Sequence, residues 1–345
     1  MNLVSSIGVV AIGRNEGERL RRCLRSLPSG MVAVYVDSGS TDGSADFARS
    51  RGVEVVDLDL SKPFSMARAR NEGFRLLRHL HPELSWVQFV DGDCEVDAGW
   101  LECAAAFLAE RPDVVAVAGR RREQHPEHSV YNRLCDLEWD TPVGDARAVG
   151  GDALMRAEAL EQVGGFNEAL IAGEEPELYL RLRRTGWKVW RLDAEMTRHD
   201  ANILTFRQWW KRMQRGGYGS LDVVARLKAT TPSSDIPFSF MTRSSRTWTL
   251  GWAAVTGLAA LTLSLWVGAW GAATGLALGV GLWLAQALRL ARAARRRGAD
   301  LSTALAYGFL TLLCKWAQVL GQFRYLRDMR AGRVAKLIEY KEISR

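Results

Sequence analysis

The chain has 345 residues, enough for two domains or for one large domain and an additional segment. Hydrophobic residues make up 48%, charged residues make up 25% and the net charge is a mild +7, so a packed core is possible and extensive disorder is excluded. The five cysteines are odd in number and form no Cys-x-x-Cys pair, which argues against a zinc ribbon or a disulfide framework and favours reduced thiols.

Residues 1–245 alternate short apolar runs with amphipathic stretches. The apolar runs predict strands at Ile7–Ile12, Val32–Val36, Val53–Leu58, Trp86–Val90 and Val114–Val117. Helical patterns lie between them, at 20–27, 44–51, 64–80 and 98–110. This alternation predicts an α/β fold with a mostly parallel sheet, in which a ligand binds beyond the carboxyl ends of the strands.

Polar loops follow the first two predicted strands. Asn15 and Glu16 come after the first, and the small-residue loop 37–44 begins with Asp37 at the end of the second. Such a carboxylate can accept hydrogen bonds from a base or a ribose, and the small residues allow a ligand to approach the backbone. The alternative is an ordinary strand–turn–helix, with Asp42 or Ser44 as the N-cap of the helix.

The fourth predicted strand ends in Asp91-Gly92-Asp93. Two carboxylates one residue apart can hold a divalent cation beside phosphate oxygens, although the pattern alone is weak. Asp57-Leu58-Asp59 matches it too, and lacks the glycine. We interpret this second copy as a solvated edge.

An acidic cluster and a histidine occur further along the chain. Pro176 predicts the first position of a helix that runs to Thr185, which puts Glu175 at its amino end. Complementing the helix dipole is an alternative reason for acidic residues there. His199 follows a predicted strand at Lys188–Leu192, and a lone histidine is more often structural than a ligand.

The last hundred residues are of a different kind. No charged residue occurs from Thr247 to Leu288, which predicts a membrane hairpin of two helices, about 248–267 and 271–289, with a turn at 268–271. A buried pair of helices in a soluble protein is the alternative. Basic residues flank the hairpin on both outer sides, so both ends are expected in the cytoplasm.

A third apolar segment, 301–323, contains Lys315 and is predicted to lie in the membrane interface or to re-enter the membrane, with a third span left open. A basic tail follows it, comprising Arg324, Arg327, Arg330, Arg333 and Lys336.

Together the motifs resemble the family 2 glycosyltransferases, which have a GT-A fold. The resemblance covers about residues 5–220 and rests on the order of the motifs, namely Asn15-Glu16, 36–44, Ala-Arg-Asn-Glu-Gly at 69–73, Asp-Gly-Asp at 91–93, Gly-Gly-Phe at 164–166, 173–178 and His199. It implies a glycosyltransferase domain at 1–230. Composition and charge predict the rest of the chain, with a junction at 231–246, the hairpin at 247–289, and an interfacial segment with a basic tail at 290–345.

The resemblance also implies roles for individual residues. Nucleotide-binding positions are Ala11, Asn15, Glu16, Asp37, Arg70 and Asp91, with Asp37 reading the base, usually uracil. Metal ligands are Asp93, the more direct one, with Asp91 and His199, for Mg²⁺ or Mn²⁺. The catalytic base is Glu175, one methylene longer than the usual Asp, with Glu174 as the other candidate. Gly151 and Asp152 match the acceptor region.

The implied activity is inverting transfer of a sugar from a nucleoside-diphosphate donor, expected to be a UDP-sugar, to a lipid-linked or glycan acceptor. The enzyme is expected in the cytoplasmic membrane, multi-pass, with its catalytic domain in the cytoplasm and no nucleic-acid partner. A processive polysaccharide synthase is an alternative, although 208–212 does not match the Gln-x-x-Arg-Trp motif of such enzymes. An inactive membrane scaffold of the same fold is another, although its carboxylates would be expected to be damaged.

Overall fold

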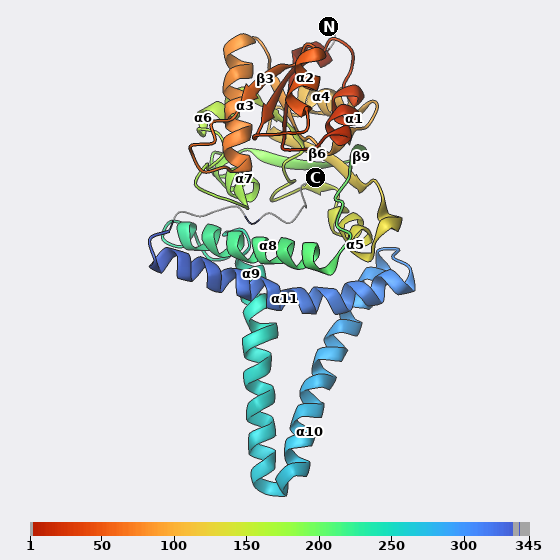
Figure 1. Cartoon of the computed structure of the whole chain (residues 1–345), viewed down its shortest axis with the longest axis vertical. Coiled ribbons are helices and arrows are strands. Elements are labelled where there is room, and N and C mark those ends of the chain that lie inside the picture. Colours follow the sequence, from red (N-terminus) through yellow and green to blue (C-terminus); the bar gives the residue numbers. More distant parts are fainter. Residues whose placement is uncertain (1–2, 334–337, 339–345) are drawn as a thin grey trace.

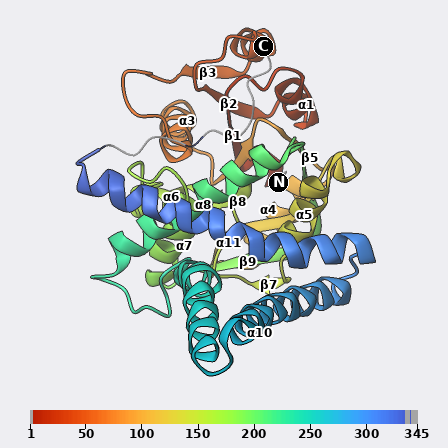
Figure 2. The same ribbon diagram turned by 60° about the horizontal axis from the view of Figure 1, so that its bottom comes forward.

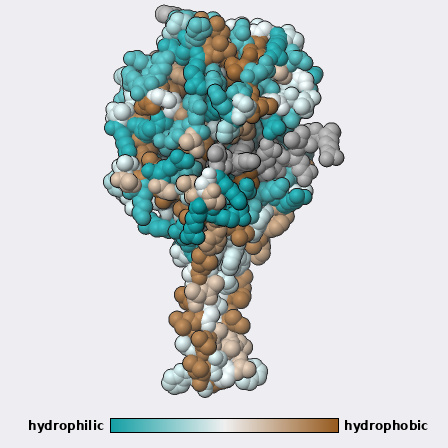
Figure 3. Space-filling view, turned by 60° about the vertical axis from the view of Figure 1, so that its left-hand side comes forward, coloured by the Kyte–Doolittle hydropathy of each residue, from teal (hydrophilic) through white to brown (hydrophobic). Residues whose placement is uncertain are grey.

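The computed structural model describes residues 3–333 and Ile338, so Lys336 of the basic tail lies outside the described residues. A part built around a β-sheet lies above a platform of helices, and a helical hairpin projects from the other side of the platform (Figure 1). The surface of the hairpin is mostly hydrophobic, whereas that of the sheet-containing part is mostly hydrophilic (Figure 3).

The sheet has the strand order β3-β2-β1-β4-β8-β6-β9-β5. Its first half is parallel and consists of β1 (Ile7–Gly13), β2 (Val32–Asp37), β3 (Glu54–Asp57) and β4 (Trp86–Asp91). Its second half contains β5 (Cys94–Val96), β6 (Val114–Glu123), β8 (Ala153–Arg156) and β9 (Lys188–His199), and β7 (Gly144–Asp145) pairs with β9. Because β8 is antiparallel to both β4 and β6, the sheet is mixed but mostly parallel, as predicted.

Helices cover both faces of this sheet, which explains why the central strands are apolar throughout rather than alternating. These helices are α1 (Glu18–Ser26), α2 (Ser44–Ser50), α3 (Met66–Leu80), α4 (Trp100–Glu110), α5 (Val130–Trp139), α6 (Ala157–Gln162) and α7 (Glu174–Arg184). Short 3₁₀ turns lie at Leu3–Ser6 and Pro126–His128. Every residue of β1 from Ile7 to Ile12 is buried.

Some predicted bounds were wrong. The N-cap of α2 is Gly43, in the left-handed region, and neither Asp42 nor Ser44 caps the helix. Helix α7 begins at Glu174, two residues before Pro176, because Gly173 supplies the left-handed N-cap. Strands β6 and β9 run well past their predicted ends, since their polar extensions pair with each other.

Two long helices form the platform, α8 (Phe206–Leu227) and α11 (Leu301–Arg330). They pack along each other beneath the sheet (Figures 1 and 2). The hairpin comprises α9 (Ser239–Arg246), a π-helical turn at Thr247–Gly251 and α10 (Trp252–Arg296). Within α10 the backbone reverses at Val267 and Gly268, so the turn begins one residue before the predicted position.

Two described helical segments are long and apolar enough to cross a membrane, Ser239–Arg296 and Leu301–Arg330. Only 6% of the apolar window of the first is buried, against 50% for the second. The first therefore exposes its apolar side chains, whereas the second is half covered by the protein.

Close contact of the platform helices depends on glycine. A Cβ atom on Gly217 of α8 would overlap the backbone oxygen of Gln318 in α11, whereas a Cβ on the neighbouring Gly216 would meet nothing within 4 Å. We expect Gly217→Ala to lower stability by about 1–3 kcal/mol because the helices must separate. Gly216→Ala should be neutral or stabilising by up to about 1 kcal/mol, because alanine suits a helix interior better. Unfolding midpoints of the full chain in detergent measure both, and equal midpoints for the two variants would contradict the packing.

Candidate active site

A cavity of about 730 Å³ lies beyond the carboxyl ends of β1, β2 and β4. One part of its wall comes from the loops after these strands and from α3, β9 and α7. The opposite part comes from α8 and α11 of the platform. The chain therefore encloses the predicted ligand position between the sheet and the platform.

The loops after β1 and β2 hold each other in place. Asn15, which has a positive φ of 54°, accepts a hydrogen bond from the backbone N–H of Thr41 at 2.7 Å. Its own N–H donates to Ser40 Oγ at 2.9 Å. Asn15 and Glu16 both line the cavity, and their contact with a nucleotide stays a prediction.

Two other predicted nucleotide residues lie beneath the cavity rather than on its wall. Asp37 is 4% exposed, and its carboxylate accepts hydrogen bonds from the N–H groups of Gly39 and Ser40, at 3.0 and 2.7 Å, and from Tyr35 Oη at 3.1 Å. Ala11 is fully buried in the middle of β1. In this arrangement Asp37 shapes its own loop, and its contact with a base stays a prediction.

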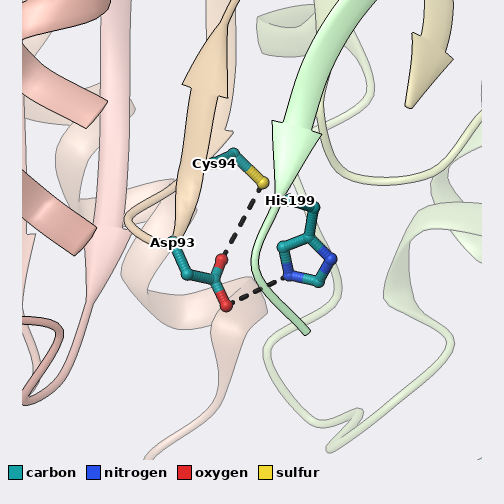
Figure 4. Close-up of side chains that lie close together, drawn as sticks. All are labelled: Asp93, Cys94 and His199. Atoms are coloured by element: carbon teal, nitrogen blue, oxygen red, sulfur yellow. Dashed lines mark hydrogen bonds and ion pairs between the residues drawn. The ribbon is translucent and has the colours of Figure 1, made fainter. Parts of the chain in front are cut away.

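Asp93 of the predicted metal motif contacts the predicted histidine, His199. His199 Nε2 lies 3.0 Å from Asp93 Oδ2, and Cys94 Sγ lies 3.8 Å from Asp93 Oδ1 (Figure 4). The antiparallel ladder of β5 with β9 produces this contact by pairing Cys94 with His199. One donor atom from each of the three residues lies within 4.8 Å of the others.

This donor set fits a divalent ion. A carboxylate oxygen and an imidazole nitrogen are accepted by Mn²⁺ and related ions. Cys94, which the sequence did not indicate, adds a thiol that such ions do not favour, and burial raises the pKa of this thiol well above its usual value. His199 Nδ1 is buried and has no hydrogen-bond partner among the described residues. Trp139 packs on the imidazole, with 4.7 Å between ring centroids, and so fixes its plane.

Asp91 points to a different partner. Its Oδ1 accepts a hydrogen bond from Arg70 Nη2 at 2.9 Å, and it does not belong to the group around Asp93. The second Asp-x-Asp copy is exposed, and Asp57 pairs there with Arg49 at 2.6 Å. Within the described residues, only the first copy therefore lies at the cavity.

Arg70 connects the metal motif with the acidic cluster. This guanidinium is 1% exposed, and its Nη1 donates to Glu174 Oε1 at 2.8 Å and to Glu175 Oε1 at 3.4 Å. Three carboxylates around one buried cation thus share its charge, and they raise the pKa of Arg70 above its usual value against the opposing effect of burial.

The two adjacent glutamates differ in environment. Glu174 is fully buried, and burial together with the charge of Glu175 raises the pKa of Glu174 to about 7. Glu175 is part of the cavity wall, whereas Glu174 is not. Of the two candidates for the base, Glu175 is the one that a bound molecule can reach.

The predicted acceptor residues support the site from below. A Cβ atom on Gly151 would overlap the guanidinium of Arg70 and lie 3.0 Å from Glu175 Oε1, so only glycine leaves room for this ion pair. Asp152 is fully buried, pairs with Arg121 at 2.7 Å and accepts a hydrogen bond from the N–H of Asp91 at 3.1 Å. It holds the end of β4 in place and does not line the cavity.

Several cavity residues were missed by the sequence analysis. Arg121 lies in the polar end of β6, in a run of three arginines that indicates acidic partners without identifying them. Nothing in the sequence indicated that Trp139 belongs to the site. On the platform side the missed residues are Trp209, Arg212, Met213, Arg215, Tyr307 and Gln318. The sequence did single out Lys315, because it is the one charged residue in the apolar segment 301–323.

Comparison with known proteins finds similar glycosyltransferases. The family model described as Glycosyl transferase family 2 matches residues 8–163. A pre-mycofactocin glycosyltransferase of Mycobacterium tuberculosis is 26% identical over 268 residues, which is 74% of this chain and 54% of that protein. The chain thus matches about half the length of this relative. The succinoglycan biosynthesis protein ExoA of Rhizobium meliloti is 25% identical over 292 residues, covering 78% of this chain and 80% of that protein.

Solved structures show the same fold. The mannosyltransferase PcManGT from Pyrobaculum calidifontis, in complex with GDP-Man and Mn²⁺, superposes with a TM-score of 0.58 over 94% of this chain and 87% of that one, at 16% identity. The predicted GT-A architecture with additional C-terminal helices is confirmed. The family model, which matches residues 8–163, and the curated relatives support a family 2 glycosyltransferase.

Proposed function

We propose that this glycosyltransferase moves a sugar from a UDP-sugar to a hydroxyl of a lipid-linked acceptor, with inversion, at the cytoplasmic face of the membrane. The observation that carries the proposal is a single cavity that contains Asp93 and His199 on one side of Arg70 and Glu175 on the other. An inverting displacement needs charge stabilisation at the leaving group and a base on the opposite face of the sugar.

The donor end of the cavity is the end with Asp93 and His199. A divalent ion held by these residues would neutralise charge on the departing diphosphate. Asn15 and Glu16 lie in the same wall and are suited to contact the nucleoside. Arg70 anchors Asp91 by an ion pair, so this part of the wall is rigid before any donor binds.

Glu175 is the proposed general base. Its carboxylate reaches the cavity, and its ion pair with the fully buried Arg70 fixes its direction. Glu174 instead neutralises Arg70 from the buried side, at 2.8 Å. The longer side chain of Glu, compared with the Asp usual at this position, suits a base that is tethered to a cation.

The acceptor proposal rests on the hairpin and the platform. Apolar side chains are exposed at the tip of the hairpin, where Trp266 and Trp270 are 87% and 83% exposed. Exposed apolar residues also recur along α11, at Leu301, Leu305, Phe309, Leu320 and Phe323. A hairpin that spans a bilayer and a helix that lies at its surface would bring the cavity next to lipids.

Cysteine labelling can test the topology. Cys103 is the exposed cysteine among the five, and the other four are buried. We expect a membrane-impermeant maleimide to leave Cys103 unlabelled in intact spheroplasts and to label it after permeabilisation. An Ala269→Cys variant on a Cys103→Ser background puts its thiol at the hairpin turn and should be labelled without permeabilisation. Labelling of Cys103 in intact spheroplasts would contradict a cytoplasmic catalytic domain, and an unlabelled Ala269→Cys would contradict two spans.

A processive synthase is less well supported. In the non-matching segment 208–212, Gln208 is used within the chain, because it forms a capping box with Thr205 at the start of α8. An inactive scaffold is also disfavoured, because Asp91, Asp93 and Glu175 all line the cavity.

Hydrolysis of nucleotide sugars tests the proposal. Purified full chain is mixed with UDP- and GDP-sugars, with and without Mn²⁺, and release of the nucleotide is measured. We expect slow, Mn²⁺-dependent hydrolysis of at least one UDP-sugar. The GDP-sugars belong in the screen because PcManGT binds GDP-Man. If only GDP-sugars were hydrolysed, the proposed preference for uracil over guanine in the donor would be wrong. If no nucleotide sugar were hydrolysed, the proposed class of donor would be wrong.

A further inference from the structure

The platform side of the cavity contains basic side chains that neither the donor nor the base explains. Arg212 and Arg215 reach it from α8, and Lys315 reaches it from α11. The acidic residue on the same side is Glu138, which lies 3.4 Å from Arg212. Arg215 also attracts the buried Glu174 electrostatically. Among the described side chains that α5, α8 and α11 contribute to the cavity wall, three are basic and one is acidic.

Of these three basic residues, Lys315 gives the clearest indication of a ligand. It is half-buried, and its Nζ lies 3.4 Å from Gln318 Oε1, a neutral group. Among the residues that the structure describes, no carboxylate lies within ion-pairing distance of it. Removing a lysine from water without a counter-charge is unfavourable, so a partly buried, unpaired ammonium in a cavity wall indicates an anionic ligand.

The surroundings of Lys315 indicate an amphiphilic ligand. On α11 the cavity-lining residues recur at helical spacing, at Tyr307, Leu310, Thr311, Cys314, Lys315 and Gln318. Beside them on the same side of the cavity, α8 supplies Trp209 and Met213, which pack in one hydrophobic cluster with Leu310 and Cys314. Apolar surface thus adjoins the ammonium within one cavity. A free inorganic ion would make no use of that apolar surface.

The position of this wall in the molecule indicates which kind of amphiphile binds there. Helix α11 lies between α8 and the hairpin (Figure 1), and it also contributes residues to the cavity wall. A ligand that enters from a membrane would therefore pass this wall before it reaches Glu175. Phosphate is an anionic group that many lipids carry, and lysine binds it as a point charge.

We infer that Lys315, together with Arg212 and Arg215, binds the phosphate of a lipid-linked acceptor and so orients the acceptor hydroxyl toward Glu175. This inference rests on the proposed function and deepens it, because it names the chemical class of the acceptor and its binding residues. The donor diphosphate would occupy the other end of the cavity, beside Asp93 and His199.

The test measures binding without catalysis. Hexyl phosphate is titrated into the full chain in a non-ionic detergent, and affinity is followed by calorimetry. We expect Lys315→Gln to weaken binding at least tenfold and Lys315→Arg to retain it within about threefold. The matched control is Lys211→Gln, because Lys211 belongs to α8 but does not line the cavity. This variant should bind hexyl phosphate with the same affinity as wild type.

Three comparisons identify the ligand. Inorganic phosphate and hexanol should each bind at least tenfold more weakly than hexyl phosphate, because each lacks one half of the amphiphile. UDP with Mn²⁺ should bind wild type and Lys315→Gln equally and should not displace hexyl phosphate. Equal affinity for inorganic phosphate would overturn the lipid class, and displacement by UDP would assign the anion to the donor.

The outcomes separate this inference from the proposed function. If wild type does not bind hexyl phosphate, or if Lys315→Gln binds it normally while nucleotide sugars are still hydrolysed, the inference alone fails. If no nucleotide sugar is hydrolysed but binding of hexyl phosphate depends on Lys315, the proposed function fails and the anion site stands.

Discussion

Asp93→Ala is expected to abolish sugar transfer, with a loss of about 10³-fold or more. Asp93 is buried and contacts His199 at 3.0 Å, so the substitution removes one donor atom and the partner of the imidazole together. Charge stabilisation at a leaving group is worth several kcal/mol, and each 1.36 kcal/mol corresponds to about a tenfold change in rate. Product formation and the Mn²⁺ dependence of nucleotide binding are the measurements, and both should be lost.

Asp57→Ala is the control for this prediction. It changes the same residue type in the second Asp-x-Asp copy, where the carboxylate is 69% exposed and pairs with Arg49 at the surface. Exposed ion pairs contribute little to stability, so this variant should keep its activity. An inactive Asp57→Ala beside an active Asp93→Ala would mean that the wrong pair had been chosen.

Glu175→Gln is expected to lower turnover by about 10²-fold or more while leaving donor affinity nearly unchanged. The amide keeps the size of the side chain and can still bond to its surroundings, but it cannot accept the proton of the acceptor hydroxyl. Loss of a base acts in the transition state, so the rate of transfer falls whereas binding of the donor does not. Single-turnover transfer rates and nucleotide titrations measure the two effects separately.

Glu174→Gln separates the neighbouring glutamates. The side chain of Glu174 is buried, and a glutamine there can still accept the hydrogen bond from Arg70 Nη1. We expect a decrease of less than tenfold in turnover. If Glu174→Gln were the variant with the 10²-fold loss and Glu175→Gln were nearly normal, the base would have been assigned to the wrong residue.

The sequence by itself determined the α/β architecture and the hairpin. Strand and helix patterns depend on residues a few positions apart, so the buried runs of β1, β2 and β4 could be located without knowledge of their neighbours. The same holds for the charge-free segment 247–288 and its Gly-containing turn. The order of the motifs also indicated Asp93, His199 and Glu175, and all three line one cavity.

Only the tertiary structure decided which partners these residues have. The contact of Asp93 with His199 depends on the pairing of β5 with β9, and the ion pairs of Arg70 join α3 to β4 and α7. Such contacts follow from topology, since they join elements far apart in the chain. For the same reason the burial of Asp152 was not predictable.

The platform side of the site was the least visible in the sequence. Residues of α11 follow the metal motif by more than two hundred positions, and the apolar pattern of 301–323 fits a span, an interfacial helix or a core helix equally well. What distinguishes these possibilities is the partner against which the helix packs. Because α11 packs on α8, where Gly217 allows close approach, one of its faces closes the cavity and brings Lys315 into the same space as Glu175.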